Sequence, residues 1–287
     1  MRSKERTINM TATETMARTE VFHSPTFVSR VKSMLKLDFY RLFHTRAFHI
    51  MLLIAAIIPA MVLSMSGMEM SPPPSNSPHS VITQTTQQAA MPEIENAWQM
   101  IESTGGSAVA DNPLDFAGFA NINMLFIFAG LLMAIFVAHD YSSGYVKNMF
   151  TVHSKKIDYV ISKTAVGLFG GAGMIVAYVF GTVIAGLLTG KAFDVNISGL
   201  ILCLISKMFL MGVFCSLFLS IAVFFRNKLW LTIVFTFLFG MMFYPAASVA
   251  TLNSTGVTVI LTLIAGIIGA VVFGTVSTVF LKKRDLA

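Results

Sequence analysis

The segment 139–163, HDYSSGYVKNMFTVHSKKIDYVISK, decides the fold, because it is polar and basic and lies between two long apolar stretches. The stretch before it covers 119–138, and the stretch after it covers 164–188. The segment is too polar to enter a bilayer, whereas each neighbour has the ~20 residues that a helix needs to cross the hydrocarbon core. The sequence therefore predicts two membrane-spanning helices that 139–163 joins outside the membrane.

Four further apolar stretches of similar length complete the pattern. Hydrophobic residues make up 55% of the chain and charged residues only 12%, which does not fit an ordinary soluble domain. A membrane β-barrel would show short alternating segments instead. We therefore predict an all-α membrane protein in which six transmembrane helices form one domain at 47–281. The four further stretches lie at 47–66, 197–225, 229–249 and 257–281.

Lysine and arginine are concentrated on one side of these six helices. Of the 20 Lys and Arg residues, Lys191 and Lys207 alone lie outside the basic segments, and 67–118 carries acids but neither Lys nor Arg. Short loops rich in Lys and Arg stay in the cytoplasm. Both termini are therefore predicted to be cytoplasmic, and 67–118 to be an extracellular loop at the cell membrane. The basic segments are 1–46, 139–163, 226–228 and 282–287.

Two segments precede the first transmembrane helix, and a short one follows the last. Residues 1–25 are polar without periodicity and are predicted to form a disordered cytoplasmic tail. Residues 26–46 are predicted to form an interfacial amphipathic helix on the inner leaflet, with a plain charged flank as the alternative. Residues 282–287 are predicted to be a cytoplasmic C-terminus. The apolar residues at helical spacing in the amphipathic segment are Val28, Val31, Leu35, Phe39 and Leu42.

The extracellular loop contains a proline-rich part at 71–91 and then a predicted short helix at 92–103. This helix either rests on the outer mouth of the bundle or is only a local feature of the loop, and the sequence leaves both interpretations open. Glycines crowd the third apolar stretch, and Gly266 and Gly274 belong to a series of small residues at spacing four in the sixth. Such residues indicate close helix packing, either within one chain or between chains.

The sequence lacks the chemistry of several protein classes. No Asp or Glu lies inside the six apolar stretches, which argues against a proton-driven carrier. Histidines are scattered without a metal-binding motif, and the segment AGLLTGKA at 185–192 fails the phosphate-loop pattern at Ala185 and Ala192. We therefore expect no metal, no cofactor and no enzyme activity in this chain. Its net charge of +6 is expected to face anionic lipid rather than nucleic acid.

Lys207 is the one Lys or Arg inside an apolar stretch. One interpretation is that its side chain extends outward to the headgroups. The other is that it lies on a substrate path, where it faces a polar cavity and meets an anionic part of the substrate or pairs with an acid of the outer loop.

The middle of the polar segment predicts a short cytoplasmic helix at 145–152, with Val146, Met149 and Phe150 on one face. Gly144 precedes it. An apolar ridge with basic ends suits docking into a groove on a soluble partner. A solvated loop with an incidental apolar triplet is the alternative.

This arrangement resembles the cytoplasmic link between the second and third spans in the membrane subunits of ATP-binding-cassette exporters, the ABC type-2 permease family. An acid closes the second span there, a glycine follows, and a coupling helix and a basic pair lead into the third span. The resemblance covers most of the chain. Asp140 stands here where Glu is commoner, His153 where Pro is common, and Lys155 where Arg is usual. The matching positions are Asp140, Gly144, 145–152, Ser154-Lys155 and Lys163.

The resemblance implies a type-2 ABC exporter fold and a permease subunit that moves a hydrophobic or amphipathic substrate, such as a peptide, a lipid-like molecule or a drug. It implies two copies of a separate cassette ATPase, which would bind ATP and Mg, and a second membrane subunit of the same or a different kind. A secondary carrier or channel, or a membrane sensor or anchor, are the alternatives. The residues that it assigns to ATPase coupling are Asp140, Gly144, Val146, Met149, Phe150, Lys155 and Lys163.

Overall fold

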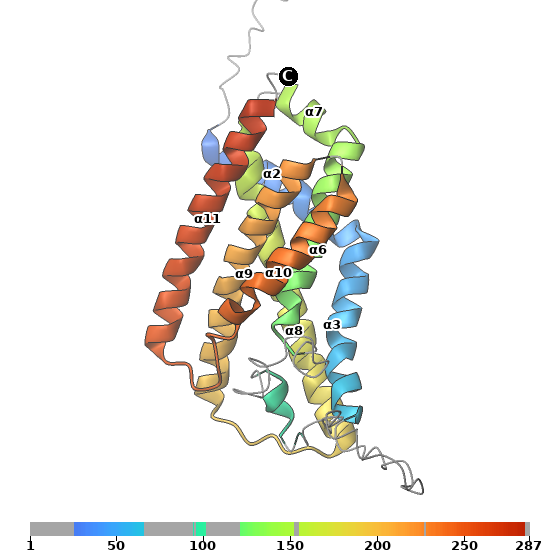
Figure 1. Ribbon diagram of the computed structural model, residues 1–287, viewed down its shortest axis with the longest axis vertical. Helices are drawn as coiled ribbons and strands as arrows, with labels where there is room; N and C mark the ends of the chain where they lie inside the picture. Colours follow the sequence, from blue (N-terminus) through green and yellow to red (C-terminus); the bar gives the residue numbers. More distant parts are fainter. Residues whose placement is uncertain are drawn as a thin grey trace, which may run out of the picture.

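The computed structural model describes residues 26–65, 94, 96–101, 121–151, 155–226 and 228–284. These residues form eight α-helices and one 3₁₀ helix, and they contain no strand (Figure 1). The elements are α2 (Phe27–His44), α3 (Arg46–Met65), η1 (Ala97–Met100), α6 (Met124–Ser142), α7 (Tyr145–Thr151), α8 (Lys156–Thr189), α9 (Ile197–Phe225), α10 (Leu229–Ala247) and α11 (Gly256–Arg284).

Six of these helices, α3, α6, α8, α9, α10 and α11, are long and apolar enough to cross a membrane, which confirms the predicted all-α fold with six spans. Four of them, α3, α6, α8 and α11, extend beyond the apolar stretches that predicted them, and α6 and α8 extend the furthest. Helix α6 continues to Ser142, and α8 begins at Lys156. Asp140 and Asp158 therefore lie inside long helices, although they lie outside the apolar stretches.

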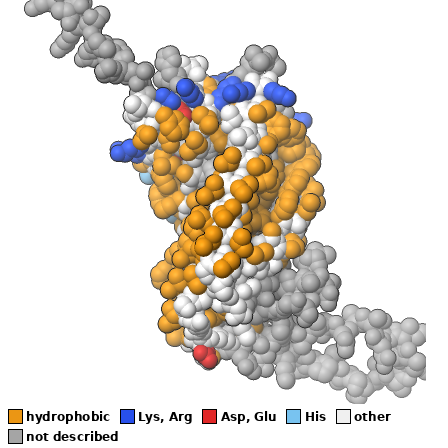
Figure 2. Space-filling model, turned by 90° about the vertical axis from the view of Figure 1, so that its left-hand side faces the viewer, with side chains coloured by type: hydrophobic (Ala, Val, Ile, Leu, Met, Phe, Trp, Pro, Cys, Tyr) orange, Lys and Arg blue, Asp and Glu red, His pale blue; other side chains and the backbone are white. Residues whose placement is uncertain are grey.

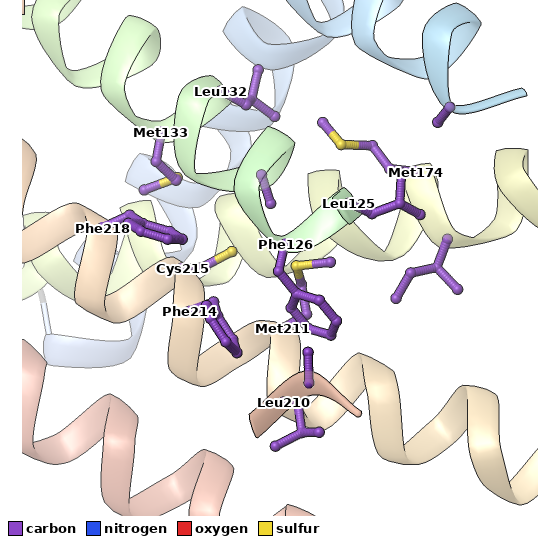
Figure 3. Close-up of a cluster of buried hydrophobic side chains, with 14 of the residues drawn as sticks. Leu125, Phe126, Leu132, Met133, Met174, Leu210, Met211, Phe214, Cys215 and Phe218 are labelled. Carbon is purple, nitrogen blue, oxygen red and sulfur yellow. The ribbon is translucent and has the colours of Figure 1, made fainter. Parts of the chain in front are cut away.

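Helix α9 lies at the centre of the bundle and packs against α6, α8, α10 and α11. Its neighbours contribute large apolar side chains to a shared core (Figure 3). In that core the rings of Phe126 on α6 and Phe214 on α9 lie 4.7 Å apart, next to Met211 and Cys215. The outer helices α10 and α11 bury little of their surface. Figure 2 shows one face of the molecule, with hydrophobic side chains along its length and Lys and Arg gathered at one end.

That basic end holds both ends of the described chain. Arg30 near the start of α2 pairs with Asp158 in the first turn of α8, and Lys156 of the same turn donates to the Leu281 carbonyl of α11 at 3.0 Å. The first turn of α8 thus joins the two ends. Predictions for 1–25, 67–91 and Ser154 lie outside the described residues.

The predicted amphipathic segment does form a helix, α2, and Thr26 caps it by accepting a hydrogen bond from Ser29 N. Its buried stripe differs from the predicted one. Val28 is 71% exposed, whereas Asp38 is fully buried between Met34 and Leu42. A carboxylate therefore occupies a place in the stripe that packs against α8.

The described part of the segment 67–118 includes η1, which packs on the end of the bundle opposite the basic end (Figure 1). Trp98 lies against Phe193 at 5.7 Å between ring centroids, and Tyr178 of α8 donates to the Met100 carbonyl at 3.2 Å. Within the predicted helix at 92–103, η1 covers Ala97–Met100 and is capped by Asn96 and Ile101, while residues 92, 93, 95, 102 and 103 lie outside the described part of the chain. Of the two interpretations, this packing supports the one in which it rests on the bundle.

The glycines of α8 allow close approach within one chain. A Cβ at Gly181 would lie 2.1 Å from the Ala56 carbonyl oxygen of α3, whereas a Cβ at Gly173 would meet no atom nearer than 3.7 Å, on Leu52. Backbone atoms cannot yield as a flexible side chain can. At Gly181 the backbones of α3 and α8 therefore come too close to leave room for a Cβ.

Replacing Gly181 with alanine is expected to lower the midpoint of thermal unfolding in detergent. The new methyl group would force α3 and α8 apart, and such overpacking costs about 1–3 kcal/mol. Gly173→Ala on the same helix is the matched control and should keep the wild-type midpoint or raise it slightly. Equal midpoints for the two variants would contradict the close approach.

Candidate functional site

Four charged side chains from three helices meet in the interior at the basic end of the bundle. Asp38 and Arg41 come from α2, Asp140 from α6 and Lys163 from α8. The Lys163 ammonium nitrogen lies 2.7 Å from Asp38 Oδ1 and 2.7 Å from Asp140 Oδ2. Arg41 Nη2 lies 2.6 Å from Asp140 Oδ1, a close charge contact without hydrogen-bond alignment. We call these four residues the buried charge cluster.

The buried charge cluster is balanced in charge and supported by hydroxyl groups. Its two carboxylates face two cations, and Asp38, Asp140 and Lys163 are fully buried. Ser162 donates to Asp38 Oδ2 at 2.6 Å, and Tyr159 donates to Asp140 Oδ2 at 3.1 Å. Buried ions are tolerated only when they are paired and hydrogen-bonded in this way.

Helical spacing explains how one face of α8 supplies three of these groups. Tyr159, Ser162 and Lys163 lie three and four residues apart, so they share a face, and Asp38 and Arg41 share a face of α2 for the same reason. The ring of Phe136, one turn before Asp140 on α6, lies 4.0 Å below the Lys163 ammonium. The cluster therefore fixes α2, α6 and α8 to one another at a single point.

Helix α7 begins at Tyr145, shortly after Asp140 of the buried charge cluster in the sequence. Gly144 has a φ of 71°, a left-handed conformation that glycine adopts at no steric cost, and it turns the chain from α6 into α7. The Arg41 guanidinium lies 4.2 Å above the ring of Tyr145, the first residue of α7. Burial, and then the nearby Asp38 and Asp140, raise the pKa of Tyr145 to about 12, so its phenol stays neutral.

The apolar ridge of α7 is turned inward, which corrects the prediction that it projects toward a partner. Val146 and Met149 are buried, and the Phe150 ring lies 6.1 Å from that of Tyr159 on α8. Val146 and Met149 are thus already removed from water within their own chain, and Phe150 is partly buried there. The exposed face of α7 consists of Lys147, Asn148 and Thr151.

The residues assigned by the resemblance are brought together only in part. Asp140 and Lys163 meet in the buried charge cluster, and Gly144 lies at the turn that leads from it. Lys155 is exposed at the position that precedes α8, away from the cluster. Asp38 was missed by the sequence reasoning. The available signal was an acid flanked by Leu35 and Leu42 in the apolar stripe of an amphipathic helix.

Lys207 forms a second buried polar site, toward the other end of the bundle. Its side chain is fully buried, so the interpretation that it extends to the headgroups is wrong. Its ammonium donates to Asn123 Oδ1 at 2.7 Å and to the Ala247 carbonyl at 3.3 Å. Tyr244 donates to the neighbouring Asn121 at 2.8 Å. The Ser206 hydroxyl beside Lys207 is buried without a hydrogen-bond partner.

Neither site has the composition of a metal centre, since the described residues contain no group of three or more His, Cys, Asp or Glu side chains placed to bind an ion. No family model, no curated protein and no solved structure matches this chain. By their length and composition, the six long apolar helices indicate a multi-pass helical membrane protein.

Proposed function

We propose that this chain is the permease subunit of an ATP-driven exporter of the ABC type-2 kind, with its termini in the cytoplasm. The observation that carries the proposal is the way in which α7 packs against other helices of its own chain. A short helix outside the spans is held at Tyr145 by Arg41 of α2 and at Phe150 by Tyr159 of α8. A helix held in this way transmits a push to three other helices instead of yielding as a loop would.

The route of that push follows from the contacts. Displacement of α7 would reach α8 through Phe150 and Tyr159, and α2 through Tyr145 and Arg41. The buried charge cluster would carry it on to α6, because Lys163 bridges Asp38 and Asp140. Packed helices joined by ion pairs shift as units between discrete arrangements, which is how a transporter changes access.

The proposed assembly contains two cassette ATPases and a second membrane subunit of the same or a different kind. ATP and Mg would be bound by the ATPases. The positive-inside distribution of Lys and Arg supports a cytoplasmic α7 in the cell membrane, where an ATPase can reach it. An almost wholly apolar groove of about 590 Å³ between α8 and α11 is within the size range of small-molecule sites and supports a hydrophobic or amphipathic substrate.

In this structure, the face of α7 that is open to an ATPase is not the apolar face that the sequence predicts to dock. The inward face of α7 would position this helix against the rest of the chain through Val146, Met149 and Phe150. The start of α7 would be held in place by Asp140, Gly144 and Lys163. The ATPase would then contact the exposed side chains of α7, which are Lys147, Asn148 and Thr151. Lys155 is also exposed and would lie at the edge of the contact. Lys207 would lie on the substrate path, at the other end of the bundle.

Reversing the charge at Lys147 should therefore release the ATPase. Lys147→Glu places a carboxylate in the proposed contact, and a mismatched charge there costs several kcal/mol. We expect the ATPase subunit that co-purifies with the wild-type chain to be lost, and substrate-stimulated ATP turnover with it. Lys36→Glu reverses the charge of another exposed lysine, on α2; it is the control and should retain both.

Two results would count against the exporter. One is a wild-type chain that is well folded in native membranes and recovers no nucleotide-hydrolysing partner. The other is a Lys147→Glu variant that binds the partner as the Lys36→Glu control does, which would show that α7 is not the contact.

A further inference from the structure

A recess of about 570 Å³ opens where α6 meets the turn between α9 and α10, apart from the buried charge cluster and from Lys207. It is polar at one end and apolar at the other. On α6, Ile135 and Ala138 lie one turn before His139 and Ser142, so the change in polarity follows the helix axis. The lining residues are Ile135, Ala138, His139, Tyr141, Ser142, Arg226 and Leu229.

The recess lies at the level where headgroups meet the hydrocarbon core. Trp230, the next residue after Leu229, is 65% exposed, and Lys228 is exposed beside it. Exposed Trp is enriched at this level of a membrane. The polar end of the recess therefore faces headgroups, while Ile135 and Leu229 face acyl chains.

Arg226 is held at the polar end in an unusual conformation. Its φ of 45° is the one positive value among the described residues other than glycine, and such strain persists where the surroundings fix it. Its guanidinium lies 5.2 Å above the ring of Tyr141. Within the described part of the chain, no Asp or Glu oxygen lies within ion-pair distance of it. A half-buried, positioned cation thus borders the recess.

We propose that this recess binds one anionic phospholipid. Arg226 contacts the headgroup phosphate, Ser142 and His139 offer hydrogen bonds to it, and the start of an acyl chain lies against Ile135 and Leu229. Planar guanidinium groups suit phosphate oxygens. The apolar end favours a lipid over a free phosphate ion, since an inorganic ion would leave that end uncovered.

The site has a consequence for α7. Tyr141 and Ser142 are the last residues of α6 before the turn at Gly144. A bound lipid therefore stabilises the segment from which α7 begins. The lipid site requires only a membrane-embedded chain. Its test therefore does not depend on the exporter proposal. The orientation given under the proposed function would place this site in the cytoplasmic leaflet.

The test uses the purified full chain in nanodiscs of phosphatidylcholine, alone or with about a fifth phosphatidylglycerol. The lipid retained by the protein is measured by native mass spectrometry, and the midpoint of thermal unfolding is followed in parallel. The wild type should retain phosphatidylglycerol in preference to phosphatidylcholine and unfold at a higher temperature when it is present. Arg226→Gly removes the guanidinium without backbone strain, since glycine tolerates positive φ.

The preference for phosphatidylglycerol should fall at least tenfold in Arg226→Gly, equivalent to about 1.4 kcal/mol. Lys228→Gln removes a charge from the same turn outside the recess and should retain the wild-type preference. An unchanged preference in Arg226→Gly, or an equal loss in Lys228→Gln, would overturn the proposal. So would a full stabilisation by inorganic phosphate in nanodiscs of phosphatidylcholine alone, because the ligand would then be the free ion.

Discussion

Replacing Lys163 with methionine is expected to destabilise the protein severely. Methionine fills a similar volume, but it leaves Asp38 and Asp140 buried with Arg41 as the remaining cation of the cluster. Breaking a buried ion pair by removing one partner costs about 3–5 kcal/mol, because the other charge stays uncompensated. The measurement is the midpoint of thermal or denaturant unfolding in detergent, and it should fall steeply.

Two further variants separate this effect from a general intolerance of substitution. Lys155→Met removes an exposed charge just before α8 and should leave the midpoint within experimental error. Combining Lys163→Met with Asp38→Asn should cost less than the sum of the two single changes, since one stranded carboxylate is then neutralised. Strict additivity would show that Lys163 and Asp38 are not coupled, in conflict with their 2.7 Å contact.

Replacing Asn123 with leucine is expected to give a smaller but still large loss of stability. Its Oδ1 accepts from the fully buried Lys207 ammonium at 2.7 Å, and hydrogen bonds to charged groups contribute about 1.5–3 kcal/mol. Leucine is of similar size and offers no acceptor. We expect a lower unfolding midpoint in detergent, with the helix content of the folded protein unchanged, as judged by far-UV circular dichroism.

Ser206 provides the matched control for Asn123. It precedes Lys207 on α9 and is fully buried, but its hydroxyl has no hydrogen-bond partner. Ser206→Ala should therefore be neutral or slightly stabilising. If Ser206→Ala and Asn123→Leu lower the midpoint by the same amount, the loss reflects packing around Lys207 and not the hydrogen bond to its ammonium.

Composition and periodicity were sufficient to predict the helices, because each span depends on its own residues. The six spans, α2 and α7 all follow from local apolar patterns. The same patterns failed to say which neighbour covers a given face. Val146 and Met149 share a face of α7, as predicted, but nothing local shows that this face packs inward and not toward a partner.

The charged sites were harder to predict for a related reason. Asp140 and Lys163 were singled out through the resemblance, yet Asp38, the second carboxylate that Lys163 pairs with, lies in a distant part of the sequence. Lys207 was recognised as unusual, and its burial depends on Asn123 and Ala247, which come from two other segments of the chain. Contacts between distant segments are set by how helices pack together, and one sequence by itself does not record that arrangement.

The ion pair between Asp38 and Lys163 also constrains the order in which the chain assembles. The two residues are 125 positions apart, and a ribosome that adds 5–20 residues per second needs about 6–25 s to make the intervening chain. During that interval α2 has been made, with Arg41 3.9 Å from Asp38 in the final structure, but Lys163, the cation that lies 2.7 Å from Asp38, has not. Asp38 must therefore stay in contact with water, and α2 must wait at the membrane surface until α8 is inserted. The first helix of the described chain therefore reaches its final place only after α8 has been made.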